Sequence, residues 1–134
     1  MIEAWDGILN LVLYLISMLG LGYYAFLTVL SPNTIVGRYD LGEKSVPIIR
    51  IVGTFVLPLL IIGIYLLFRG PQGAWIFLIL NFLVSTCQVI LGWATRLKII
   101  DPDSKQDVGD EIVGHVFVLI AIILIYRLSD TIYA

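Results

Sequence analysis

The sequence predicts an all-α protein, a polytopic membrane four-helix bundle that forms a single transmembrane domain over residues 1–134. Apolar residues make up 60% of the chain and its mean hydropathy is +1.01, whereas soluble domains are usually about 45–50% apolar. The length fits one domain. The apolar residues gather in four long segments, and helices are expected there because lipid offers the backbone no hydrogen-bond partners.

The four predicted helices cover approximately residues 8–30, 46–68, 74–95 and 111–128. About 20 apolar residues are needed to cross the hydrocarbon core, so the fourth helix, which is the shortest, needs an extra turn at its ends. No lysine or arginine precedes the first segment, and we expect it to remain as a membrane helix rather than to be a cleaved signal peptide. The short, glycine-rich turn at residues 69–73 makes the second and third helices antiparallel neighbours.

Prolines and acidic residues mark the predicted helix ends. Pro32 ends the first helix and Pro47 begins the second. Pro58 lies in the middle of the second helix, where it frees a backbone carbonyl and favours a kink. Glu111 and the aspartates before it lie at the start of the fourth helix, where the helix dipole favours negative charge.

The basic residues predict how the chain is oriented. Six lysines and arginines lie in or beside the two long connections, and two lie on the opposite side. The positive-inside rule therefore places both long loops in the cytoplasm and both termini outside, and we expect a bacterial inner membrane. Aromatic residues near the segment ends are typical of an interfacial belt that anchors helices in a bilayer: Trp5, Trp75, Trp93, Tyr23, Tyr24, Tyr65 and Tyr126.

The second and fourth helices share a pattern that suggests an internal repeat. Residues 51–67 align without a gap on residues 112–128, with eight identities in seventeen positions that include a shared Ile-Val-Gly. A true repeat predicts two helical hairpins in the same orientation, a 2+2 arrangement about a pseudo-two-fold axis along the membrane normal. The alternative is a chance match between segments built from isoleucine, leucine and valine, and both interpretations stay open.

The repeat also predicts an ionic contact. Arg50 and Glu111 each stand one residue before the shared Ile-Val-Gly, so we expect the two charges at the same depth and within ion-pair reach. His115 lies four residues beyond Glu111, on the same helix face. With polar residues of the neighbouring helices, these side chains form the predicted binding site, a polar pocket in the cytoplasmic half: Tyr24, Thr28, Arg50, Thr54, Gln88, Glu111 and His115.

Each of these residues also has a purely structural interpretation. Arg50 is typical of an arginine that reaches to the membrane interface, and Glu111 is typical of an acidic residue at a helix N-terminus. Gln88 belongs to a polar stripe along the third helix, and a second stripe that includes Asn10 and Tyr14 follows the first helix. Such stripes let membrane helices approach and hydrogen-bond to one another.

The composition excludes several classes of function. The single cysteine, Cys87, rules out an intramolecular disulfide and a cysteine-based metal cluster. The net charge of −2 leaves no basic surface for nucleic acid. No motif indicates a metal site or a cofactor, and Glu111 with His115 is the one acid–base pair available for catalysis.

The size, the four spans and the Arg50-x-x-Gly53 at the start of the second helix resemble the DoxX-like group of small four-helix bacterial membrane proteins and their uncharacterised relatives. The resemblance covers the layout of the chain, and the arginine–glycine pair is its sequence content. It implies four membrane helices and, for some members, an association with membrane redox systems or thiosulfate oxidation. Family chemistry through paired cysteines is excluded here because Cys87 stands alone.

We therefore expect a small integral membrane protein that acts as a non-enzymatic accessory or scaffold subunit of a larger membrane complex. Its expected partners are the lipid bilayer and either other membrane protein subunits or further copies of itself. The alternative function is binding or transport of a small molecule, such as a quinone, a lipid or an anion, in the predicted polar pocket. Catalysis in the membrane is the least favoured of the three.

Overall fold

The computed structural model describes residues 1–39, 41–99 and 111–133, and these residues form helices with no strand among them. Three helices are long and apolar enough to cross a membrane, namely α1 (Ile8–Val29), α3 (Val46–Arg69) and α4 (Trp75–Arg96). A fourth apolar helix, α5 (Glu111–Arg127), is shorter. The predicted all-helical class is confirmed for these residues, and the three spans indicate an integral membrane protein.

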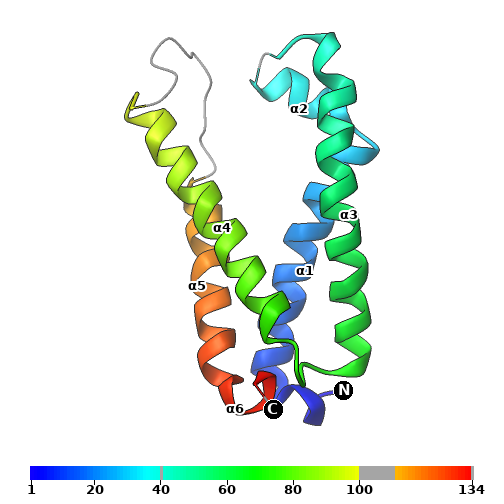
Figure 1. Ribbon diagram of the computed structural model, residues 1–134, viewed down its shortest axis with the longest axis vertical. Coiled ribbons are helices and arrows are strands. Elements are labelled where there is room, and N and C mark those ends of the chain that lie inside the picture. The colour runs from blue at the N-terminus through cyan, green and yellow to red at the C-terminus, as the bar shows by residue number, and fades with distance from the viewer. Residues whose placement is uncertain (40, 100–110, 134) are drawn as a thin grey trace.

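The four apolar helices begin and end within one residue of their predicted ranges. Helix α3 runs unbroken through Pro58. Gly70 and Gly73 in the turn after α3 have φ values of +100° and +71°, a conformation that favours glycine because it has no Cβ atom. The turn reverses the chain, so that α4 runs back antiparallel to α3 (Figure 1).

The connection between α1 and α3 contains a short helix that the sequence did not predict, α2 (Pro32–Tyr39). Proline ends a preceding helix but is tolerated in the first turn of a new one, because that turn needs no N–H donor there. The Thr34 N–H donates to the Ser31 carbonyl at 3.2 Å, and the two hydroxyls lie 2.9 Å apart. Helix α2 then packs against both α1 and α3. Three shorter elements complete the described part: η1 (Glu3–Trp5), η2 (Glu43–Ser45) and α6 (Ser129–Ile132).

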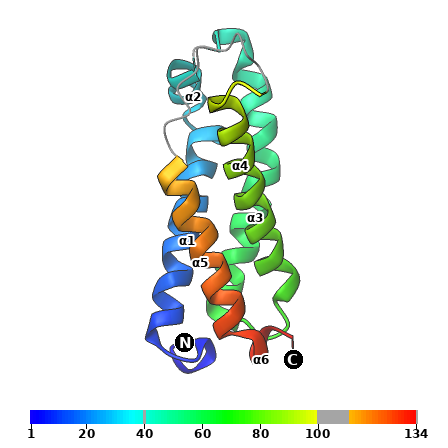
Figure 2. The ribbon, with the colours of Figure 1, turned by 90° about the vertical axis from the view of Figure 1, so that its left-hand side faces the viewer.

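The apolar helices associate as two pairs. Helix α1 packs on α3, α4 packs on α5, and α1 contacts α5 between the pairs, whereas α3 and α4 do not pack along their length. Figure 1 shows that the pairs lie close together at the end that holds both termini and diverge toward the end where α2 lies. We call these ends the terminal end and the α2 end. Figure 2 shows the same four helices from the side of α4 and α5.

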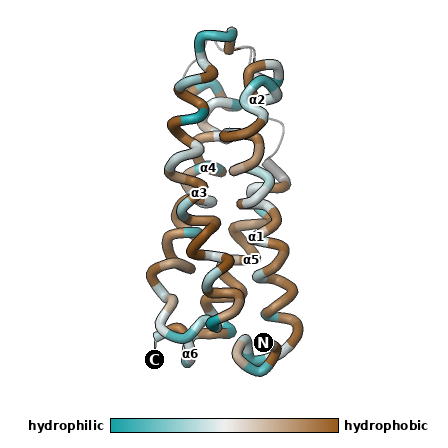
Figure 3. The backbone as a smooth tube through the Cα atoms, turned by 90° about the vertical axis from the view of Figure 1, so that its right-hand side faces the viewer, coloured by the Kyte–Doolittle hydropathy of each residue, from teal (hydrophilic) through white to brown (hydrophobic). Residues whose placement is uncertain are grey.

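The hydrophobic core lies toward the terminal end. Its buried members come from η1, all four apolar helices, the turn before α4 and the C-terminal segment: Trp5, Leu11, Tyr14, Met18, Leu66, Ala74, Phe77, Leu78, Ile120, Leu124, Leu128 and Ile132. Many large apolar side chains elsewhere on the four helices are exposed, and Figure 3 shows hydrophobic residues along the length of the helices. Such an apolar surface suits contact with lipid, which needs no polar coat.

Glycines allow the two helices of each pair to approach closely. A Cβ atom at Gly53 of α3 would lie 2.9 Å from Oγ1 of Thr28 on α1. A Cβ atom at Gly114 of α5 would lie 2.9 Å from Cγ2 of Val89 on α4. In both pairs, therefore, the helix that returns to the terminal end places a glycine against a side chain of the helix before it.

Candidate functional site

Two of the predicted site residues come from α1 and two from α3. Thr28 is buried, and its hydroxyl donates to the carbonyls of Tyr24 and Ala25 at 3.0 and 3.1 Å. Thr54 is exposed, and its hydroxyl donates to the Ile51 carbonyl at 2.6 Å. Arg50 is exposed on α3. Because both threonine hydroxyls bond to their own helix, the structure gives them a packing role.

The other predicted site residues come from α4 and α5. Gln88 is exposed on α4, and His115 is exposed on α5. Helix α5 begins at Glu111, but the side chain of Glu111 lies outside the described part of the structure. The expected contact between Arg50 and Glu111, and with it the polar pocket, therefore stays a prediction.

The structure joins His115 to residues that the predicted site did not include. The Trp93 indole N–H donates to Nε2 of His115 at 3.2 Å, and the two rings meet edge to face. The Arg96 guanidinium carbon lies 5.6 Å from the centroid of the Trp93 ring, within the range of a cation–π contact. These contacts tie the start of α5 to the end of α4.

The most developed polar cluster lies at the terminal end and is centred on Asn10, which is fully buried. The Asn10 amide nitrogen donates to the carbonyls of Trp5 and Asp6 at 3.0 and 3.2 Å. Its carbonyl oxygen accepts a 2.6 Å hydrogen bond from Nε of Arg127. The guanidinium makes this bond charge-assisted and stronger than a neutral one, and it ties α1 to the end of α5.

Two aromatic side chains extend this cluster to α3. The Trp5 ring is buried and stacks on Tyr14 with 4.1 Å between the ring centroids. The Trp5 indole N–H donates to the Leu67 carbonyl at 3.3 Å, and the Tyr14 hydroxyl donates to the Gly63 carbonyl at 2.6 Å. The prediction that Trp5 anchors the chain at the membrane interface is wrong, because its ring lies inside the protein. We call Trp5, Asn10, Tyr14 and Arg127 the terminal cluster.

The terminal cluster holds helices together and leaves no buried donor or acceptor for a ligand. Every buried side-chain nitrogen and oxygen in the described residues has a hydrogen-bond partner. Asn10 and Tyr14 belong to the predicted polar stripe of the first helix, so the stripe did identify an inward face. Nothing in the sequence marks the carbonyls of Gly63 and Leu67 as their neighbours, because every residue carries a carbonyl.

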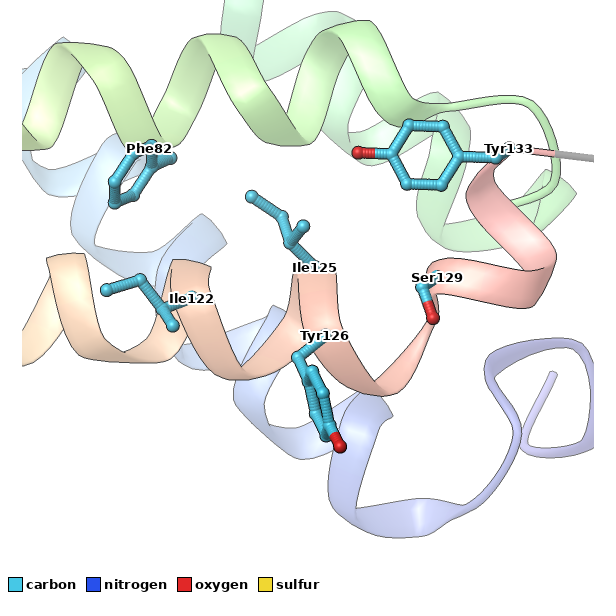
Figure 4. A pocket seen from close by; sticks show the side chains of 6 residues that line it. All are labelled: Phe82, Ile122, Ile125, Tyr126, Ser129 and Tyr133. Atoms are coloured by element: carbon cyan, nitrogen blue, oxygen red, sulfur yellow. The ribbon is translucent and has the colours of Figure 1, made fainter.

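A groove of about 390 Å³ opens between α4 and the α5–α6 segment (Figure 4). It is lined by Phe82, Ile122, Ile125, Tyr126, Ser129 and Tyr133. In Figure 4, the apolar side chains of Phe82 and Ile122 lie toward one end, and the hydroxyl-bearing Ser129 and Tyr133 lie toward the other. Its volume falls within the range of small-molecule sites, about 300–1,000 Å³. The periodicity of apolar residues in the sequence did not predict this groove, because the groove depends on how two helices lie next to each other and not on the sequence pattern of either helix.

Metal-ligating residues do not converge in the described part: no group of three or more histidine, cysteine, aspartate or glutamate side chains there is placed to hold an ion. Comparisons of the chain with protein-family models, with curated proteins and with solved structures find no match.

The remaining feature with chemical consequences is α4, the least buried of the three long helices. Only 11% of its most apolar stretch is buried, against 28% for α1. It nevertheless carries several polar side chains. Those of Asn81, Thr86 and Thr95 donate to carbonyls of their own helix at 2.7–2.9 Å. Gln88 is exposed and makes no hydrogen bond with any described residue.

Proposed function

We propose that this protein is a non-enzymatic accessory or scaffold subunit of a larger membrane assembly, and that it acts by lateral contact with other transmembrane helices. The observation that carries this proposal is Gln88, a polar side chain without a described partner on the most exposed of the long helices. A helix that met only lipid would be expected to carry no such residue.

The position of Gln88, far from both ends of α4, makes an amide without a hydrogen bond energetically costly. The residue lies thirteen positions after the start of α4 at Trp75 and eight before its end at Arg96, so it is roughly 12 Å from the nearer end at 1.5 Å per residue. At that depth, an amide without hydrogen bonds costs several kcal/mol, of order 2–7. A polar group on a neighbouring membrane helix removes this cost, and such interhelical bonds contribute about 0.6–2 kcal/mol each.

We also propose a four-helix bundle of two repeated hairpins as the architecture of this subunit. Gly53 packs against Val29 and Thr28, and Gly114 packs against Val89. Gly114 and Val89 lie sixty-one positions after Gly53 and Thr28, which is the offset of the sequence repeat. This equivalence supports a repeat better than the matching isoleucines do, because isoleucines can match by chance in apolar segments, whereas here two helix–helix contacts occupy equivalent positions. Kinship with the DoxX-like group belongs to the same proposal.

The decisive experiment is native mass spectrometry of the protein extracted in mild detergent, comparing the wild type with Gln88→Leu. We expect the wild type to be recovered with partner subunits or further copies, and Gln88→Leu to lose most of that association. Thr86→Val is a matched control, because its hydroxyl already bonds to the Phe82 carbonyl. A wild-type protein that is a single free protomer in every extract contradicts the proposal.

Binding of a hydrophobic small molecule is a second candidate, favoured by the groove between α4 and the α5–α6 segment. An apolar groove of this size suits the apolar tail of a lipid or quinone. Ile122→Trp is expected to fill the groove and to reduce the lipid or quinone that co-purifies, measured by mass spectrometry of organic extracts. Leu119→Trp is the control, since Leu119 is exposed on α5 outside the groove. Equal amounts of bound molecule in both variants contradict this role.

A further inference from the structure

Helix α3 is weakened in its interior, around Pro58. Because proline has no N–H, the carbonyl of Thr54 loses the donor that an intact helix would offer it, and the proline ring crowds that carbonyl. The Thr54 hydroxyl also bonds back to the Ile51 carbonyl at 2.6 Å, a type of contact that often bends helices. The backbone of α3 is therefore easier to bend here than elsewhere along its length.

The helix that packs on α3 is weakened at the same depth. Gly20 and Gly22 lie in the interior of α1, where glycine leaves the backbone more conformational freedom than any other residue. A Cβ atom at Gly22 would lie 3.7 Å from Cδ1 of Leu60, and Leu60 is two residues beyond Pro58. The glycines of α1 and the proline of α3 therefore lie at one level of the pair, which we call the hinge level.

The hydrophobic core that joins the two helix pairs ends at the hinge level. Its buried members nearest to the α2 end are Met18 on α1 and Ile120 on α5. Farther toward the α2 end, no described residue of α4 or α5 is buried. The contact at this boundary is between Gly20 and Phe117 of α5, whose ring fills the place of a Cβ atom. Beyond the hinge level, the first pair therefore shares no buried core with the second.

The part of the first pair beyond the hinge level is nevertheless packed within itself. Thr28 and Val29 of α1 contact Gly53 of α3, and α2 packs against both helices. Its buried residues come from α1, α2 and α3: Ala25, Leu27, Thr28, Pro32, Ile49, Gly53 and Val56. This part can therefore move as one body without losing its internal contacts.

We infer that the end of α1 beyond Gly22, α2 and the start of α3 before Pro58 form a hinged unit. The unit bends at the hinge level and changes the separation of the two pairs at the α2 end, while the terminal cluster holds the other end together. The second pair is the stiff side, because residues 75–91 of α4 and 115–127 of α5 contain neither glycine nor proline. The divergence of the pairs in Figure 1 is then one of a range of separations.

Double electron–electron resonance between nitroxide labels measures these separations in lipid nanodiscs. In a Cys87→Ser background, Ile51→Cys on α3 and Leu91→Cys on α4 report on the α2 end. Phe68→Cys on α3 and Tyr126→Cys on α5 report on the terminal end, and all four labelled positions are exposed. We expect the distance distribution to be roughly twice as broad at the α2 end as at the terminal end, because only the α2 end moves about the hinge.

The hinge residues are tested by the double variant Gly22→Ala/Pro58→Ala. Alanine at position 58 restores the N–H for the Thr54 carbonyl, and the Cβ atom at position 22 makes an ordinary van der Waals contact. We expect the distribution at the α2 end to become about twofold narrower, because both helices stiffen, and the distribution at the terminal end to stay unchanged. Each single substitution is expected to give part of this narrowing, so the test does not depend on one variant.

Gly37→Ala/Pro47→Ala is the matched control, with the same residue changes away from the hinge level. A Cβ atom at Gly37 would meet nothing within 4 Å, and Pro47 lies in the first turn of α3, which needs no N–H donor. Both distributions are expected to stay as in the wild type. Equal breadth at the two ends of the wild type overturns the inference, and so does an α2 end that stays as broad in the hinge variant. A control variant that narrows the α2 end as much as the hinge variant also overturns it.

Discussion

Asn10 shows how much one polar side chain can organise among apolar helices. Its amide bonds to the carbonyls of Trp5 and Asp6, and its oxygen receives the Arg127 hydrogen bond. In lipid the hydrophobic effect gives helices little reason to associate, so hydrogen bonds and close packing decide which faces meet. The terminal cluster therefore helps to fix the helix arrangement at the end where the termini lie, since its hydrogen bonds join α1 to α3 and to α5.

Replacement of Asn10 by leucine is expected to destabilise the protein by about 2 kcal/mol, because a hydrogen bond to a charged group contributes about 1.5–3 kcal/mol. The measurement is the free energy of unfolding of the purified protein in mixed micelles as the denaturing detergent increases. Asn81→Leu is the matched control, since the Asn81 amide bonds only to the Phe77 carbonyl of its own helix. Similar losses in the two variants would show that the bond to Arg127 contributes little.

At the scale of the helix, glycine positions decide how closely neighbours lie. Side chains of the preceding helices pack against Gly53 and Gly114, whereas a Cβ atom at Gly92 would have no neighbour within 4 Å. The same residue type therefore fixes the distance between two helices in one place and leaves a surface open in another.

Gly53→Ala is expected to destabilise the protein by about 1–3 kcal/mol, the usual cost of overpacking. Its new Cβ atom would lie 2.5 Å from Cγ2 of Val29 and 2.9 Å from Oγ1 of Thr28, and these branched side chains have little freedom to move away. Gly92→Ala is the control, and no loss of protomer stability is expected because its Cβ position is open. Thermal unfolding in detergent, followed by circular dichroism, compares the two; a Gly92→Ala loss as large as that of Gly53→Ala contradicts this account.

The elements themselves were largely predictable, and the reason is physical. Span length, proline and glycine carry most of the information about where a membrane helix begins and ends, so the four ranges were recovered within one residue. Helix α2 was missed because Pro32 was interpreted only as an end, although proline also suits a first helical turn. The position of the Trp5 side chain was predicted wrongly, because the sequence near the end of a span is the same whether an aromatic side chain faces the lipid headgroups or the protein interior.

At the scale of the whole molecule, both termini lie at one end and α2 lies at the other (Figure 1). This arrangement agrees with the even number of apolar helices in the described part of the chain. The basic residues, which concentrate near the long connections, predict that the α2 end faces the cytoplasm. The sequence thus predicts an orientation that the helix arrangement alone does not contain.

Labelling of single cysteines tests this orientation in a Cys87→Ser background. Gln72→Cys in the turn at the terminal end is expected to react with a membrane-impermeant maleimide in cells with a permeabilised outer membrane. Glu43→Cys near the α2 end is expected to react only after the inner membrane is broken. Both residues are exposed, so they serve as controls for each other. The reverse pattern would place the termini in the cytoplasm.

The bond between Asn10 and Arg127 joins positions 117 residues apart, and this has a consequence for how the protein is made. A ribosome delivers the first helix to the membrane long before the last one. Until α5 arrives, the oxygen of Asn10 has no guanidinium to accept from, and the terminal cluster is incomplete. The α1–α3 pair is therefore expected to form first, through the Tyr14 and Trp5 hydrogen bonds to α3, and the last helix completes the terminal cluster as it inserts.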